Sequence, residues 1–142
     1  MKYFTKEYIK ECDCEEIRGL RKKLQKGDWY AFADTKNIYG IHLADKDIKR
    51  FGESQIWLLL SHQLDEEIVK ICKEKDYTYH VNYISRENEW CIYVDGEEPY
   101  MPQVISDNPL IAKIIILKEL IKDTKEQYGD LEPDYYNAFD ID

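Results

Sequence analysis

The amino-acid sequence predicts an α+β domain built mainly from an antiparallel sheet of about four to five strands with helices flanking it. Two pairs of strand-like segments separated by polar turns predict hairpins, and apolar residues at helical spacing predict an N-terminal helical segment, a middle helix and a long closing helix. The chain has 142 residues, about the size of one domain. Hydrophobic residues make up 44% and charged residues 35%, a balance typical of a soluble globular domain.

The first segment is expected to form two short helices in succession. Asp13 and Glu16 have the spacing of a capping box, so the second helix is expected to begin there. Gly27 is expected to end it. The apolar residues between these points share one helix face, namely Ile17, Leu20 and Leu24.

Five strands and a middle helix are expected to follow. The segments 28–33 and 38–44 flank a polar turn and predict a first hairpin. A short apolar strand at 55–60 leads into an amphipathic helix with Ser61 as its N-cap, because Leu64, Ile68, Ile71 and Cys72 recur at helical spacing. The alternating segment 77–85 and the segment 90–94 predict a second hairpin.

The closing helix is expected over residues 110–128. Residues 96–102 hold two prolines and predict a loop, after which Asn108 supplies an N-cap and Pro109 a first helical residue. The first half of this helix is apolar almost all round, so a sheet or a partner is expected to enclose it. With Gly129 as C-cap, the chain divides into a domain over 1–129 and an acidic aromatic tail over 130–142.

Charge is polarised along the chain, whose formal net charge is −9. Residues 1–26 contain eight basic and five acidic side chains, whereas residues 86–108 contain one basic and six acidic ones. This acidic balance disfavours direct binding of nucleic acid, because like charges repel. The basic helix face formed by Arg18, Arg21, Lys22 and Lys23 is expected to be solvated, with phosphate contact as the alternative.

No sequence motif of a common catalytic site is present. A glycine-rich phosphate loop, a Gly-x-Ser-x-Gly elbow and a His-Glu-x-x-His helix are all missing from the sequence, so neither an enzymatic activity nor a cofactor is expected. Cys12 and Cys14 lack zinc-site spacing, and His42, His62 and His80 lie far apart, so no metal site is expected.

The compartment expected is the bacterial host cytoplasm. The N-terminus has no signal-peptide pattern, no apolar run is long enough to span a membrane, and the cysteines show no disulfide framework. No contact with a membrane is therefore expected.

Twelve tyrosines and three tryptophans are an unusual share for this length. Tyr77, Tyr79 and Tyr83 alternate along one strand and could stack nucleobases, but the acidic surroundings favour core packing or a protein-binding face.

The acidic aromatic tail is the most informative functional feature of the sequence. Carboxylates interleaved with aromatic rings suit docking on a basic, partly apolar protein surface, since charge steers the encounter and rings anchor it. Docking onto the chain itself or onto a symmetry mate, or disorder, is equally compatible with this composition. The residues expected to bind a partner are Glu97, Glu98, Asp130, Glu132, Asp134, Tyr135, Tyr136 and Phe139.

Three stretches resemble a family of small proteins encoded by phages and prophages of Gram-positive bacteria. Residues 4–9 with 16–28 are similar to that family's opening helix and Gly-Asp strand entry. Ile56-Trp57-Leu58, followed by Gln63-Leu64, is similar to its Trp-Leu-Pro segment and Gln-Leu-rich helix, with Leu59 in place of the proline. The helix after Asn108 resembles the closing helix of phage α/β sandwich domains. The resemblance implies a phage α/β sandwich fold and no particular activity.

The function expected is therefore protein binding by a phage or prophage accessory protein. In its sharper form, the protein is an acidic inhibitor of a host nucleic-acid-handling defence system, such as a CRISPR effector, and presents carboxylates where that effector binds phosphates. The alternatives are a small ligand-binding domain or enzyme with a pocket near His80 and a phage structural or regulatory protein. Binding of single-stranded nucleic acid through the basic first segment and exposed tyrosines, and a homodimer formed through the closing helix, also stay open.

Overall fold

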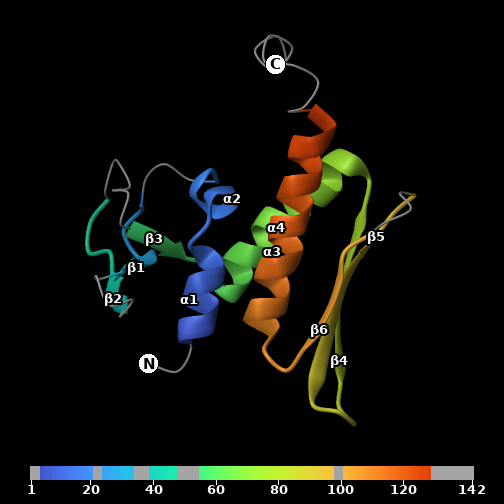
Figure 1. Ribbon diagram of the computed structural model, residues 1–142, viewed down its shortest axis with the longest axis horizontal. Coiled ribbons are helices and arrows are strands. Elements are labelled where there is room, and N and C mark those ends of the chain that lie inside the picture. Colours follow the sequence, from blue (N-terminus) through green and yellow to red (C-terminus); the bar gives the residue numbers. More distant parts are fainter. Residues whose placement is uncertain (1–3, 21–23, 34–38, 48–54, 98–100, 129–142) are drawn as a thin grey trace.

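The computed structural model describes residues 4–20, 24–33, 39–47, 55–97 and 101–128. These residues form a helical layer between two separate three-stranded antiparallel sheets (Figure 1). The helices are α1 (Lys6–Cys12), α2 (Glu15–Arg18), α3 (Ser61–Lys75) and α4 (Pro109–Tyr128). The strands are β1 (Trp29–Ala33), β2 (Tyr39–Leu43), β3 (Gln55–Leu58), β4 (Thr78–Ile84), β5 (Glu89–Asp95) and β6 (Gln103–Ser106).

The α+β class, both hairpins, the middle helix and the long closing helix agree with the sequence prediction. The prediction of one sheet was wrong, because the strands form two sheets with the orders β2-β1-β3 and β4-β5-β6. Helix α3 explains the division, since it leaves β3 at the first sheet and carries the chain through the helical layer to β4 (Figure 1). The helices therefore lie between two sheets instead of flanking one.

The N-terminal segment forms two short helices, as predicted, but the second is shorter than expected. It ends at Arg18 with Gly19 as C-cap, and Cys14 instead of Asp13 is its N-cap. Asp13 caps the end of α1 and forms an ion pair of 2.7 Å with Arg18. Gly27 has a φ of +97° and lies in the turn that enters β1, where its N–H donates to the carbonyl of Ala44.

Helix α3 begins one residue earlier than predicted, since Ser61 is its first helical residue instead of its N-cap. Leu60 is its N-cap, and the Gln63 side chain accepts a hydrogen bond of 2.8 Å from the Leu60 N–H. The Gln63 amide also donates to the buried carboxylate of Asp28, whose other oxygen accepts from the N–H of Gln25. This network connects the start of α3 to the turn before β1.

Helix α4 begins as the sequence predicts. The Asn108 side chain accepts a hydrogen bond of 3.0 Å from the N–H of Leu110, and Pro109 is the first helical residue. The apolar first half is enclosed within the chain, because α4 contacts α1, α2, α3, β5 and β6. Its inward side chains belong to the core, namely Leu110, Ala112, Ile114, Ile116, Leu117 and Leu120. These side chains are buried within the chain, and a homodimer through this helix stays a prediction.

The predicted C-cap Gly129 and the tail 130–142 lie outside the described residues. Among the helices that the structure does describe, none has the combination of length and apolar character that a membrane span requires.

Candidate functional site

Of the residues predicted to bind a partner, the structure places only Glu97, which is exposed just after β5. The other seven lie outside the described residues: Glu98, Asp130, Glu132, Asp134, Tyr135, Tyr136 and Phe139. Docking through the tail therefore stays a prediction.

The second sheet has one covered and one uncovered face. Ile92 and Val94 of β5 point toward α4 and are buried, and Tyr79 of β4 points the same way. The side chains that alternate with these point away from the helices, where no described helix or strand covers them (Figure 1). We call this surface the outer face. It consists of Thr78, His80, Asn82 and Ile84 of β4, Glu89, Cys91, Tyr93 and Asp95 of β5, and Gln103 and Ile105 of β6.

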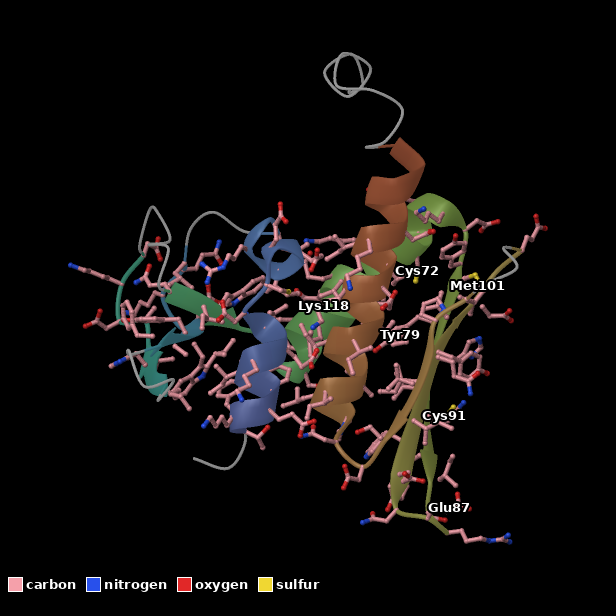
Figure 2. All side chains as sticks on the ribbon, in the orientation of Figure 1. Cys72, Tyr79, Glu87, Cys91, Met101 and Lys118 are labelled. Carbon is pink, nitrogen blue, oxygen red and sulfur yellow. The ribbon has the colours of Figure 1, made fainter. Side chains whose placement is uncertain are left out.

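Aromatic and aliphatic groups occupy the middle of the outer face. His80 pairs with Tyr93 across the two strands, and their rings stack with centroids 4.5 Å apart and planes inclined by 11°. In the next row Cys91 pairs with Ile105, whose side chain is 52% exposed. Figure 2 shows Cys91 on the side of the sheet away from α4. A stacked ring pair beside an exposed aliphatic residue is the kind of contact area that protein interfaces use.

Carboxylates lie at both ends of the outer face. Asp95 pairs with Thr78 at one end, with Glu97 two residues further along the chain, and Glu89 pairs with Ile84 at the other. The turn between β4 and β5 carries Glu87 at its tip, as Figure 2 shows. The outer face thus has an apolar middle and acidic ends, which suits a partner surface with the opposite distribution of charge.

A cavity of about 470 Å³ lies between α4 and the start of β6. His80, near which a pocket was predicted, does not line this cavity. Apolar lining comes from Tyr77, Met101, Pro102, Val104, Ile115 and Leu120, and polar lining from Gln103, Glu119, Lys122 and Asp123.

Close packing beside the cavity depends on Gly96. A Cβ at this position would lie 2.5 Å from Cδ1 of Tyr77, so the ring lies where any other residue would place a side chain. Lys75 lies near the same ring, 5.9 Å from its centroid, and pairs with Asp123 at 3.4 Å. The lining of the cavity therefore combines apolar side chains with charged ones, of which Asp123 pairs with Lys75 beside the cavity.

A polar cluster connects α3, α4 and β4 on the inner side of the second sheet. The ammonium of Lys113 donates to Ser61 at 2.8 Å and pairs with Asp65 at 3.0 Å, and the hydroxyl of Tyr79 donates to Asp65 at 2.7 Å. Burial raises the pKa of Tyr79 above its ordinary value, and the hydrogen bond to Asp65 adds to this effect. Figure 2 shows Tyr79 directed from the sheet toward the helices. None of these four side chains lines the cavity. Their hydrogen bonds connect α3, α4 and β4.

The basic first segment is only partly described. Arg18 pairs with Asp13 and also donates to the carbonyl of Gln55 at 3.4 Å, while Arg21, Lys22 and Lys23 lie outside the described residues. Arg18 thus has acceptors within the chain.

The four cysteines are free thiols, and burial raises the pKa of Cys12 to about 12. Within the described part of the chain, no group of three or more His, Cys, Asp or Glu side chains could hold a metal ion.

Sequence reasoning missed a second exposed aromatic group, on the first sheet. The rings of Tyr30, Phe32 and His42 lie between 5.4 and 5.7 Å apart. Gly40 leaves room for the histidine, since a Cβ there would lie 3.2 Å from its Nε2. The alternation of aromatic residues in 29–33 could have predicted that the rings of Tyr30 and Phe32 share one face of the strand.

The residues of the outer face were also missed as a group, apart from the separate interest in His80. Tyr93 and Cys91 alternate with the buried Ile92 and Val94, and this alternation could have placed them on the opposite face of the strand. Ile105 lies on a strand of four residues that was not predicted. Comparisons of the chain with family models, with curated proteins and with solved structures found no match.

Proposed function

We propose that this chain is a phage or prophage accessory protein that acts by binding another protein. The observation that carries the proposal is the outer face, where the stacked rings of His80 and Tyr93 and the exposed side chain of Ile105 lie between acidic ends. When a partner covers a sheet face with an apolar middle, the removal of that apolar surface from water stabilises the complex.

Charge supports the sharper form of the proposal, inhibition of a host nucleic-acid-handling defence system. Such an effector binds phosphates with basic side chains, and a chain with a net charge of −9 is attracted to the same surface. Asp95, Glu97 and Glu89 supply carboxylates beside the apolar middle, and the tail supplies more. In this proposal the rings anchor the complex and the carboxylates take the place of nucleic acid.

The experiment is an affinity capture from nuclease-treated lysate of a Gram-positive host, comparing the intact protein with matched variants. Ile105→Arg places a charge in the middle of the outer face. Leu43→Arg is its control, because Leu43 is also 52% exposed but lies on the first sheet. A further variant replaces the tail acids by Asn and Gln.

The proposal predicts that Ile105→Arg loses the captured protein and that Leu43→Arg retains it. The neutralised tail should bind more weakly, and its binding should depend less on salt. The captured protein should itself bind nucleic acid and lose that binding when the intact chain is added. If Leu43→Arg loses the partner and Ile105→Arg keeps it, the binding surface lies on the first sheet and the proposal is wrong.

A second candidate function is the binding of a small ligand, favoured by the cavity between α4 and β6. Its mixture of apolar and charged lining residues suits a small amphipathic molecule. Screening by NMR with the methyl group of Met101 as reporter tests this function. A ligand in the cavity should shift that signal, and a cavity-filling Val104→Phe variant should abolish the shift.

A further inference from the structure

Strand β4 forms an open edge of the second sheet. It pairs with β5 along one side, and no described strand pairs with its other side. The backbone N–H and C=O groups that point toward this side can hydrogen-bond to another strand. With seven residues, β4 is the longest edge strand in either sheet.

The composition of β4 lacks the features that usually prevent edge pairing. Its sequence, Thr-Tyr-His-Val-Asn-Tyr-Ile, contains no Lys, Arg, Asp, Glu, Pro or Gly. Two side chains that point toward the helical side remain exposed, Val81 by 38% and Tyr83 by 48%. Edge strands that stay unpaired usually carry charges or prolines, so this strand is suited to pairing.

Symmetry restricts how a second copy of this strand can pair with the first. In an antiparallel pair, opposite residues point to the same face of the sheet. The helix-covered faces of the two copies therefore lie on the same side of the joined sheet only when the two-fold axis passes midway between two copies of the same residue. Of the central positions, only Val81 leaves all seven residues of both strands paired, because an axis at His80 or Asn82 shortens the overlap.

The pairs in this register are compatible with one another. On the helical side Tyr79 lies opposite Tyr83 of the partner subunit, and the two Val81 side chains meet at the axis. On the outer face Thr78 lies opposite Ile84 of the partner subunit, and His80 lies opposite Asn82 of the partner subunit. Aromatic and β-branched pairs of this kind stabilise antiparallel strands.

Charge also favours a second copy as the occupant. Two chains with a net charge of −9 each repel one another, so a self-association surface needs to be free of acidic groups that no basic group compensates. β4 is uncharged, and just beyond its ends the same register brings Asp76 toward Arg86 of the partner subunit. The two ends of the strand are therefore complementary in charge as well as in length.

We propose that β4 pairs antiparallel with β4 of a second copy about a two-fold axis at Val81, so that the two second sheets become one continuous sheet. Pairing covers Val81 and Tyr83 in both copies. It also doubles the outer face, since the outer faces of the two copies then lie on the same side of the joined sheet.

The first test measures the mass of the full chain in solution by sedimentation or light scattering over a range of concentrations. The proposal predicts a mass of about twice 17.0 kDa that falls toward 17.0 kDa on dilution. Val81→Arg places two like charges at the axis and should give a monomer, with circular dichroism to show that it folds. Leu43→Arg on the first sheet should stay dimeric. A wild-type chain that stays monomeric at about 100 μM overturns the proposal.

The second test checks the register by oxidative cross-linking. In Val81→Cys the two introduced thiols face each other at the axis, within the range that a disulfide spans, so the dimer should cross-link. In Thr78→Cys the two thiols lie about 20 Å apart, because each is three residues from the axis, and no cross-link should form. The wild-type chain controls for its native cysteines. A dimer that cross-links through Thr78→Cys and not through Val81→Cys contradicts this pairing.

The two proposals fail separately. Ile105→Arg should remove the protein partner and leave the dimer intact, whereas Val81→Arg should remove the dimer.

Discussion

Lys113 of α4 and Asp65 of α3 form an ion pair of 3.0 Å whose two side chains differ greatly in exposure, 9% for the lysine and 41% for the aspartate. Water can solvate the carboxylate if its partner is removed, but it has little access to the ammonium. The two single substitutions at this pair should therefore have unequal effects.

Asp65→Ala should lower the free energy of unfolding by about 2 to 3 kcal/mol, because it removes the carboxylate that pairs with a buried ammonium and accepts from Tyr79, and leaves the ammonium bonded to the Ser61 hydroxyl. Lys113→Met should change it by no more than about 1 kcal/mol, since methionine fills the buried space without a charge. Urea unfolding measures both values. Equal losses for the two variants would contradict this assignment.

The matched control is the ion pair between Lys70 and Glu67, which is also 3.0 Å long but has a lysine that is 67% exposed. Lys70→Met should change the free energy of unfolding by less than about 0.5 kcal/mol.

The buried thiol of Cys12 should make the folded state sensitive to alkaline pH. Burial raises its pKa from an ordinary value of 9.0 to about 12, so above pH 9 the unfolded chain loses a proton that the folded chain keeps. Stability should therefore fall as the pH rises from about 9 to about 12, with a slope of up to about 1.4 kcal/mol per pH unit.

Cys12→Ala is the control for this slope. Tyr79 also has a raised pKa and contributes in the same direction above its ordinary value of 10.0. Urea unfolding at several pH values between about 8 and about 10 should thus give a flatter dependence for Cys12→Ala than for the wild type. If the two slopes are equal, the thiol does not carry the effect.

Gly96→Ala should destabilise the fold by about 1 to 3 kcal/mol, because the new methyl group would displace the ring of Tyr77. Gly19→Ala is the control, since the nearest atom to its Cβ is the carbonyl oxygen of Glu15 at 3.5 Å and its φ is −71°. That variant should be neutral or slightly stabilising. In a Tyr77→Ala background the cost of Gly96→Ala should largely disappear, and thermal unfolding of all four chains checks this coupling.

Tyr8→Phe should cost about 1 to 2 kcal/mol. Its hydroxyl donates a hydrogen bond of 2.7 Å to the buried carbonyl of Leu59, which joins α1 to the end of β3. The exposed hydroxyl of Tyr83, which bonds to Asn88, provides the comparison, and Tyr83→Phe should be close to neutral. A neutral Tyr8→Phe would show that this hydrogen bond adds little to stability.

The sequence by itself determined most of the local structure, because local structure depends on residues that are near one another in the chain. Asn108 and Pro109 mark the start of α4, and the alternation through 77–85 marks β4, since capping and strand periodicity are set within a few residues. Gly27 shows the limit of such reasoning. A glycine with positive φ suits a helix end and a strand entry alike, and the hydrogen bond to the distant Ala44 decides between them.

Only the tertiary structure decided the number of sheets and the place of the candidate site. Each strand offers hydrogen bonds to any other strand, so the sequence does not say whether β3 and β5 belong to one sheet or two. Tyr93 and Ile105 share a surface because β6, a strand of four residues after a proline, pairs with β5. That pairing depends on the helical layer beneath, which covers Ile92 and Val104 and leaves the opposite side of the same strands for a partner.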